Sequence, residues 1–161
     1  MLAIVKLSRF INCWIERLLF GIGLIMTLVV AVQVFYRYAL NHSLFWSEEL
    51  SRYLLVWLSF LGASVAYYRR AHPGIDIVVA MLPGRWKQSV SIFIHFVSLA
   101  LFGIMVWFGC QFSYFVRLQI TPALYLPKWL VMGIIPISGA VLLVHGLSLL
   151  LSDFRGQRRD G

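Results

Sequence analysis

Charged residues are scarce in this sequence: they make up 12% of its 161 residues, whereas 61% of the residues are apolar. So little polar surface could not coat a water-soluble globule, and we expect a protein whose solvent is a lipid bilayer. The formal charge of +8 does not indicate nucleic acid binding, because the basic residues lie in short clusters between apolar runs and not along one stripe.

Cysteines and enzyme motifs are equally few. The two cysteines, Cys13 and Cys110, are expected near opposite faces of the membrane, far beyond the roughly 7 Å between Cα atoms that a disulfide permits. We therefore predict two free thiols. Zinc-ligand spacings, a P-loop, a nucleophile elbow and a Gly-x-Gly-x-x-Gly run are missing as well. The sequence predicts no enzyme activity, no catalytic residue, no metal site and no cofactor.

Long uncharged runs are abundant, and they predict an all-α integral membrane protein with four transmembrane helices. A helix needs roughly 20 mostly apolar residues to cross the bilayer core, and four runs approach or exceed that length. We expect one membrane domain over residues 1–161, with spans at about 18–38, 48–68, 88–116 and 129–151.

Three shorter segments flank or connect these spans. Residues 1–17 alternate apolar and charged positions with helical period, so this amphipathic lead-in either lies in the headgroup plane or extends the first span. Residues 75–82 are too few to cross and are bounded by Pro-Gly pairs, which favours a segment lying at the interface. Residues 152–161 form a polar, basic tail.

Lysine and arginine are distributed unequally between the two sides of this topology. One side, with the links between spans 1 and 2 and between spans 3 and 4, carries Arg37, Arg52, Arg117 and Lys128. The other ten of the 14 lie on the side of the two termini. The positive-inside rule therefore places both termini in the cytoplasm.

A concentrated group of polar residues lies at the start of the second span, in the run from Trp46 to Trp57. On a helix, Glu48 and Glu49 both reach the guanidinium of Arg52. Ser47 is expected to cap this helix. We predict that the motif docks a partner; the alternative is a helix cap with an interfacial ion pair. The predicted docking residues are Trp46, Glu48, Glu49, Arg52, Tyr53 and Trp57.

Small residues and prolines mark places where helices approach closely or bend. In lipid, small side chains let a neighbouring backbone come near, and packing within this chain is favoured over contact with another subunit. Pro136 predicts a kink or a close helix contact. The expected packing residues are Ser59, Gly62, Ala63, Ala66, Gly133, Pro136 and Gly139. The expected residues at the lipid interface are Trp14, Arg69, Arg70, Trp86, Lys87 and Trp129.

Two histidines, His95 and His145, lie inside the expected spans, each about six residues from the cytoplasmic end of its helix. Their depths match, so a bis-histidine haem site is geometrically possible, and one alternative function is a cytochrome b-like haem-binding membrane anchor. A second alternative is an autonomous small transporter that works as a homodimer. One histidine on each of two helices is weak evidence for haem, and two histidines are few ionisable groups for a pump, so we favour a supporting role.

Three blocks of the sequence resemble the DctQ-like family, the small membrane subunit of tripartite ATP-independent periplasmic (TRAP) transporters. The first block runs from Trp46-Ser47-Glu48-Glu49-Leu50-Ser51-Arg52-Tyr53-Leu54 to Trp57 and Phe60-Leu61-Gly62-Ala63. The second contains His72, Ile75-Asp76 and Leu82-Pro83. The third runs from Thr121-Pro122-Ala123-Leu124 through Pro127 and Trp129 to Pro136.

The resemblance implies an accessory scaffold subunit of a secondary, sodium-coupled importer of an organic anion, such as a carboxylate or sialic acid. The implied partners are a large membrane subunit that carries substrate and sodium, a soluble periplasmic binding protein, and the phospholipid of the bacterial inner membrane. The residues agree with this implication, because a chain with almost no buried charge does not easily build its own ion pathway.

Overall fold

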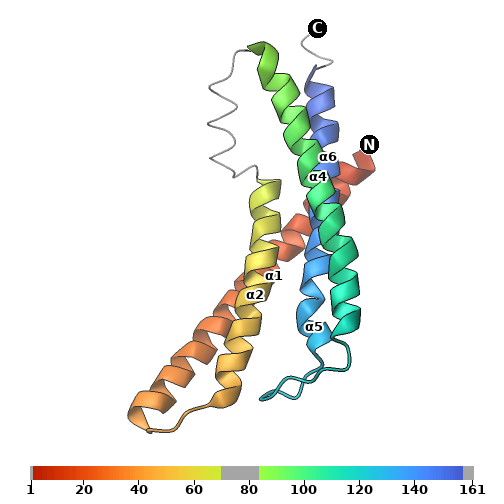
Figure 1. Cartoon of the computed structure of the whole chain (residues 1–161). Coiled ribbons are helices and arrows are strands. Elements are labelled where there is room, and N and C mark those ends of the chain that lie inside the picture. Colours follow the sequence, from red (N-terminus) through yellow and green to blue (C-terminus); the bar gives the residue numbers. More distant parts are fainter. Residues whose placement is uncertain (1, 70–83, 158–161) are drawn as a thin grey trace.

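Four long helices and one short helix make up the described part of the chain (Figure 1). This computed structural model describes residues 2–69 and 84–157, and the side chains of all of these except 2, 3, 84–89, 91 and 152–157. The expected interfacial segment 75–82 lies outside the described residues. The helices are α1 (Leu2–Ala39), α2 (Phe45–Tyr68), α4 (Gly84–Phe115), α5 (Lys128–Met132) and α6 (Ile134–Gln157).

The predicted all-α membrane fold is confirmed. Four stretches are long and apolar enough to cross a membrane: Ile4–Ala39, Phe45–Tyr68, Ile92–Phe115 and Lys128–Leu151. In the described ranges, the β-type pairing is one isolated bridge between Ile120 and Pro127, and no strand forms.

The lead-in and the first span form one unbroken helix. No proline or glycine interrupts the first 20 residues, so nothing local ends the helix there. α1 has 38 residues, about 57 Å at 1.5 Å per residue, and is much longer than the bilayer core is thick. It ends at Ala39, just before Asn41 adopts a left-handed φ of 51°, which asparagine tolerates better than most residues.

Helix α6 holds the fold together, because it packs against α1, α2 and α4. Figure 1 shows α1 and α2 as one antiparallel hairpin, and α4 followed by α5 and α6 as a second, with both connections at the lower end of the view. One core cluster joins the two hairpins through Ile15, Ile22, Leu61 and Ile134. A second cluster joins α2, α4 and α6 through Tyr67, Phe102 and Leu142.

The fourth span is broken at Gly133, and Pro136 does not kink a helix interior. α5 ends at Met132 and α6 begins at Ile134, while the Gly133 N–H donates to the Trp129 carbonyl at 2.8 Å. Pro136 is the third residue of α6. At that position a helical N–H has no partner within its own helix, so the missing proton of proline costs nothing.

Helices α4 and α6 approach closely at two glycines. A Cβ atom at Gly109 of α4 would lie 2.9 Å from both the nitrogen and the Cδ of Pro136. A Cβ atom at Gly139 of α6 would lie 3.2 Å from the backbone nitrogen of Val106. Two of the expected packing residues, Pro136 and Gly139, therefore lie at this contact, and Gly109 is a third residue that the sequence pattern did not single out.

Replacing Gly109 with alanine is expected to destabilise the fold by about 1–3 kcal/mol, because the added methyl group meets the backbone and ring of Pro136 and forces α4 and α6 apart. Unfolding of the purified chain in mixed micelles, titrated with dodecyl sulfate, measures this effect. Gly103→Ala on the same helix is the matched control, since its Cβ atom has nothing within 4 Å. Equal stability of the two variants would contradict the close contact.

The expected interface residues lie in different settings. Trp14 and Trp129 are exposed, as an aromatic residue at a bilayer boundary would be. Arg69 instead forms an ion pair with Glu16 of α1, with 2.7 Å between the guanidinium nitrogen and the carboxylate oxygen. Arg70 and the side chains of Trp86 and Lys87 lie outside the described part of the chain.

Candidate functional site

The acidic motif occupies the first turns of α2. This helix begins at Phe45, and its N-cap residue, Leu44, makes no side-chain capping bond. The predicted cap at Ser47 is therefore wrong. Ser47 is buried within the first turn, and its hydroxyl donates to the carbonyl of Leu44 at 2.7 Å. The expected span began at residue 48, three residues later than α2, because the residues Phe45 to Ser47 are already helical.

Glu49 joins α2 to a loop that lies more than 70 residues further along the chain. One carboxylate oxygen accepts hydrogen bonds from the backbone N–H groups of Ala123, at 2.7 Å, and Leu124, at 3.1 Å. The other oxygen accepts a hydrogen bond from the hydroxyl of Tyr53. The side chain is buried, with 7% of the residue exposed. Glu49 therefore acts as an anion held by two consecutive N–H groups, which favour its charged form.

The loop bound by Glu49 spans residues 119–128, and we call it the clamp loop. Its two ends pair through the Lys128 N–H and the Gln119 carbonyl, at 2.9 Å. Inside it, the buried side chain of Thr121 accepts a hydrogen bond from the Leu126 N–H at 3.0 Å. Tyr125 adopts a left-handed φ of 54°. The turn that results points the N–H groups of Ala123 and Leu124 toward α2.

The predicted docking residues divide into two sets. Glu49, Tyr53 and Trp57 point inward: the indole N–H of Trp57 donates to the carbonyl of Val131 in α5 at 3.3 Å. The remaining three, Trp46, Glu48 and Arg52, are exposed. The predicted ion pair is wrong, because within the described residues Arg52 binds neither acid. Both oxygens of Glu49 are already occupied by the clamp loop and Tyr53.

A row of polar side chains on α1, which we call the polar seam, joins α1 to α6 and α2. The hydroxyl of Ser8 lies 2.8 Å from Nδ1 of His145, and both residues are fully buried. Two turns along α1, Glu16 accepts hydrogen bonds from the amide of Asn12, at 2.8 Å, and from Arg69. This seam was not predicted from the sequence. Its signal is the spacing of Ser8, Asn12 and Glu16, since residues four apart share one helix face.

The family model described as "Tripartite ATP-independent periplasmic transporters, DctQ component" matches residues 26–156. The chain is also 30% identical over 157 residues to a putative TRAP transporter small permease protein of Haemophilus influenzae, which covers 94% of this chain and 97% of that relative. The chain belongs to the DctQ family.

Other relatives of this DctQ-family chain carry different solute names. It is 29% identical over 83 residues to the sialic acid TRAP transporter small permease protein SiaQ of Vibrio cholerae, covering 52% of this chain and 48% of the relative. It is 30% identical over 119 residues to the isethionate TRAP transporter permease protein DctMQ of Oleidesulfovibrio alaskensis, covering 71% of this chain but 18% of that longer relative. The DctQ-family chain is thus a multi-pass inner membrane component of a TRAP transporter and not an enzyme.

Family membership also decides how the two histidines are interpreted. In this DctQ-family chain, His145 is buried and engaged with Ser8, and its ring lies 5.1 Å from the ring of Tyr68. His95 is half-buried on α4. The transporter family supports a transport role over the cytochrome-like anchor, and His145 packs between α1 and α6.

The small residues of α2 are not packed against this chain as expected. Ser59 and Ala63 are exposed, Ala66 is half-buried, and a Cβ atom at Gly62 would have nothing within 4 Å. The Ser59 hydroxyl donates to the carbonyl of Leu55 on its own helix. In this part of α2, the face buried by the rest of the chain instead carries Leu61, Ser64 and Tyr67.

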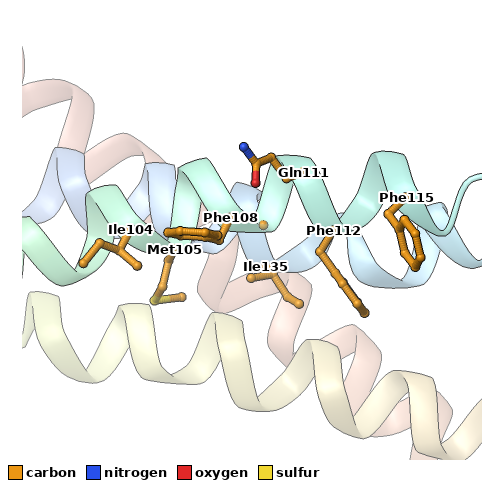
Figure 2. Close-up of a pocket in the computed structure, with 8 residues that line it drawn as sticks. Ile104, Met105, Phe108, Gln111, Phe112, Phe115 and Ile135 are labelled. Atoms are coloured by element: carbon orange, nitrogen blue, oxygen red, sulfur yellow. The ribbon is translucent and has the colours of Figure 1, made fainter.

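An open apolar groove of about 720 Å³ runs along the neighbouring part of α4. Figure 2 shows Met105, Phe112 and Ile135 pointing toward the side on which α2 runs, and Gln111 pointing away from it. No lining side chain is ionisable. The groove is lined by Ile104, Met105, Phe108, Gly109, Gln111, Phe112, Phe115 and Ile135.

Proposed function

We propose that this chain is the accessory small membrane subunit of a secondary TRAP transporter, and that it is a scaffold for a large membrane subunit that carries the solute. The observation that carries this proposal is the use of its polar groups. Glu49 binds the clamp loop, Glu16 binds Arg69, and His145 binds Ser8. Ionisable groups that are occupied in this way stabilise a rigid bundle and do not line a path for an ion.

Two longer relatives support the large membrane subunit as the partner. The matched segment is 18% of the permease protein DctMQ and 14% of the sialic acid TRAP transporter permease protein SiaT of Haemophilus influenzae. In those proteins a segment like this chain is part of a much longer permease chain. We infer that here the corresponding association forms between separate chains.

We propose sodium-coupled import of an organic anion, such as a carboxylate or sialic acid, delivered by a periplasmic binding protein. The relatives are named for sialic acid, isethionate, C4-dicarboxylate and ectoine transport. Similar small subunits with such different solute names suggest that the solute is chosen by the partners. With both termini in the cytoplasm, the start of α2 and the clamp loop face the periplasm, where the binding protein arrives.

Within this proposal the outward and inward residues have different roles. Trp46, Glu48 and Arg52 are exposed and contact the large subunit directly. Glu49, Tyr53 and Trp57 act indirectly, because they fix the clamp loop and α5 against α2. The open apolar groove along α4 and the small residues of α2 provide further apolar surface for a neighbouring helix.

The test reconstitutes the large subunit and the binding protein in vesicles, with and without this chain, and measures solute uptake under a sodium gradient. Uptake is expected only with the chain present. The variant Trp46→Ala/Glu48→Gln/Arg52→Gln should lower recovery of the large subunit by roughly tenfold or more, because truncated tryptophan and arginine anchors cost the most at interfaces.

Arg37→Gln is the control for the loss of an exposed charge, since Arg37 is the exposed basic residue near the end of α1. Solute flux through the purified chain alone, or full uptake by the large subunit without it, would contradict the scaffold. Unchanged recovery of the large subunit with the triple variant would contradict the docking role of these three residues.

A further inference from the structure

The first part of α1 divides into three sectors around its axis. At about 100° per residue, buried and exposed positions fall into separate sectors. The buried sector carries Ser8, Asn12, Ile15 and Ile22. An exposed apolar sector carries Leu7, Phe10, Trp14 and Leu18. The third sector is also exposed and carries Lys6, Arg9, Cys13 and Arg17, three of which are cationic.

The polar seam fixes the rotation of this segment. Ser8 is held by His145 of α6, and Glu16 is held by Arg69 at the end of α2. A roll of α1 about its axis would break both contacts and would bury cationic side chains against the core. The apolar and cationic sectors therefore face outward together as one fixed surface. Between positions 4 and 18 the acidic residue is Glu16, and it is already paired.

The length of α1 places this surface near the boundary of the membrane. The bilayer core takes up roughly 20 residues of a helix, and α1 has 38. Its charged side chains before Arg37 all lie within the first 17 residues. At this boundary the guanidinium of Arg17 lies over the ring of Trp14, 5.6 Å from its centroid. An indole beside a cation suits the headgroup layer, where one side of the contact is apolar and the other is wet.

We propose that Lys6, Arg9 and Arg17 form a binding surface for the headgroups of anionic phospholipids, with Phe10 and Trp14 inserted among the acyl chains beside them. The charges are complementary, since the exposed surface has three cations and no free acid. Interfacial amphipathic helices bind anionic lipid through the same division of labour, with basic side chains at the phosphates and apolar side chains among the acyl chains. Bound anionic lipid thereby anchors the end of α1 that the polar seam holds against α6.

The first test purifies the full chain from vesicles made of equal parts phosphatidylglycerol and phosphatidylcholine, and counts retained lipids by native mass spectrometry. The wild-type chain is expected to retain phosphatidylglycerol preferentially. Lys6→Gln/Arg9→Gln/Arg17→Gln should lower that preference by roughly tenfold or more, because each basic residue at an anionic surface contributes about fivefold. The control variant Arg155→Gln/Arg158→Gln/Arg159→Gln removes the same number of positive charges from the C-terminal residues and should leave the preference for phosphatidylglycerol unchanged. Equal losses in both variants would overturn the proposal.

A second measurement leaves the three cations intact. In the Cys110→Ser variant a nitroxide attached to Cys13, which is exposed within the cationic sector, reports the depth of the segment. In vesicles containing phosphatidylglycerol, the nitroxide is expected at the level of the lipid phosphates. A nitroxide in the aqueous phase, or one in the middle of the hydrocarbon core, would overturn the proposal.

Discussion

Replacing Glu49 with alanine is expected to release the clamp loop from α2. The carboxylate accepts hydrogen bonds from the backbone N–H groups of Ala123 and Leu124. Without it, these two half-buried donors both lose a charged acceptor, which destabilises the loop. Amide exchange at these two residues should accelerate by roughly tenfold or more, because the bonds that protect them are absent. Hydrogen–deuterium exchange of the chain in lipid nanodiscs measures this directly.

Two further substitutions test whether the effect is specific to the carboxylate of Glu49 or follows from the loss of any acidic residue in this turn. Glu48→Gln is the matched control: Glu48 is adjacent, exposed and not bonded to the clamp loop, so exchange at Ala123 and Leu124 should not change. Glu49→Gln retains one acceptor oxygen but no charge, and should give an intermediate rate. If Glu48→Gln accelerated exchange as much as Glu49→Ala, that result would contradict the assignment of Glu49 as the residue that holds the clamp loop.

The helices could be predicted from the sequence because their signals are local. Each span is a long uncharged run, and the amphipathic spacing of residues 1–17 already favoured a helix. The bounds moved only at the ends: α2 begins at Phe45, and α6 continues to Gln157. The break at Gly133 was harder to place, because Pro136 is the stronger local signal for a bend. Pro136 lies near the start of α6 only because α5 ends just before it, and the sequence does not mark that end.

The site could be predicted only in part, because its partners are distant in sequence. The pattern identified Glu49 as a special residue and assigned it to the nearest cation, Arg52. In the structure a pair of backbone N–H groups, 74 and 75 residues away, satisfies that carboxylate instead. Main-chain donors carry no sequence signal, and only the turn formed around Thr121 directs them toward α2.

The same reasoning explains why the polar seam was missed. Ser8 and His145 are separated by 137 residues, and each alone is ordinary in a membrane helix. Their pairing fixes how α1 lies on α6, whereas Glu49 fixes how the clamp loop lies on α2. The two contacts thus hold the two hairpins together near opposite ends of α2. The proposed scaffold role would use this property, because a bundle that keeps its shape presents the same surface to the large subunit.

The pairing of Ser8 with His145 is expected to appear as a coupling energy between two substitutions. His145→Ala should lower the free energy of unfolding by about 2–4 kcal/mol, because it removes a buried ring, leaves a cavity and leaves the Ser8 hydroxyl without this partner. Ser8→Ala should cost less, since only one hydroxyl is lost. Dodecyl sulfate titration of the folded chain in mixed micelles gives each value.

The double variant Ser8→Ala/His145→Ala completes the cycle. If the hydrogen bond is real, the second substitution costs less once the first has been made, and the difference should be about 0.6–1.7 kcal/mol, as for other hydrogen bonds between membrane helices. Ser64→Ala with His145→Ala is the matched comparison: Ser64 is equally buried, but its hydroxyl donates to the carbonyl of Leu61 on its own helix, so these two losses should add. Additive losses for Ser8 and His145 as well would mean that the packing of the imidazole ring, and not this hydrogen bond, positions α1 on α6.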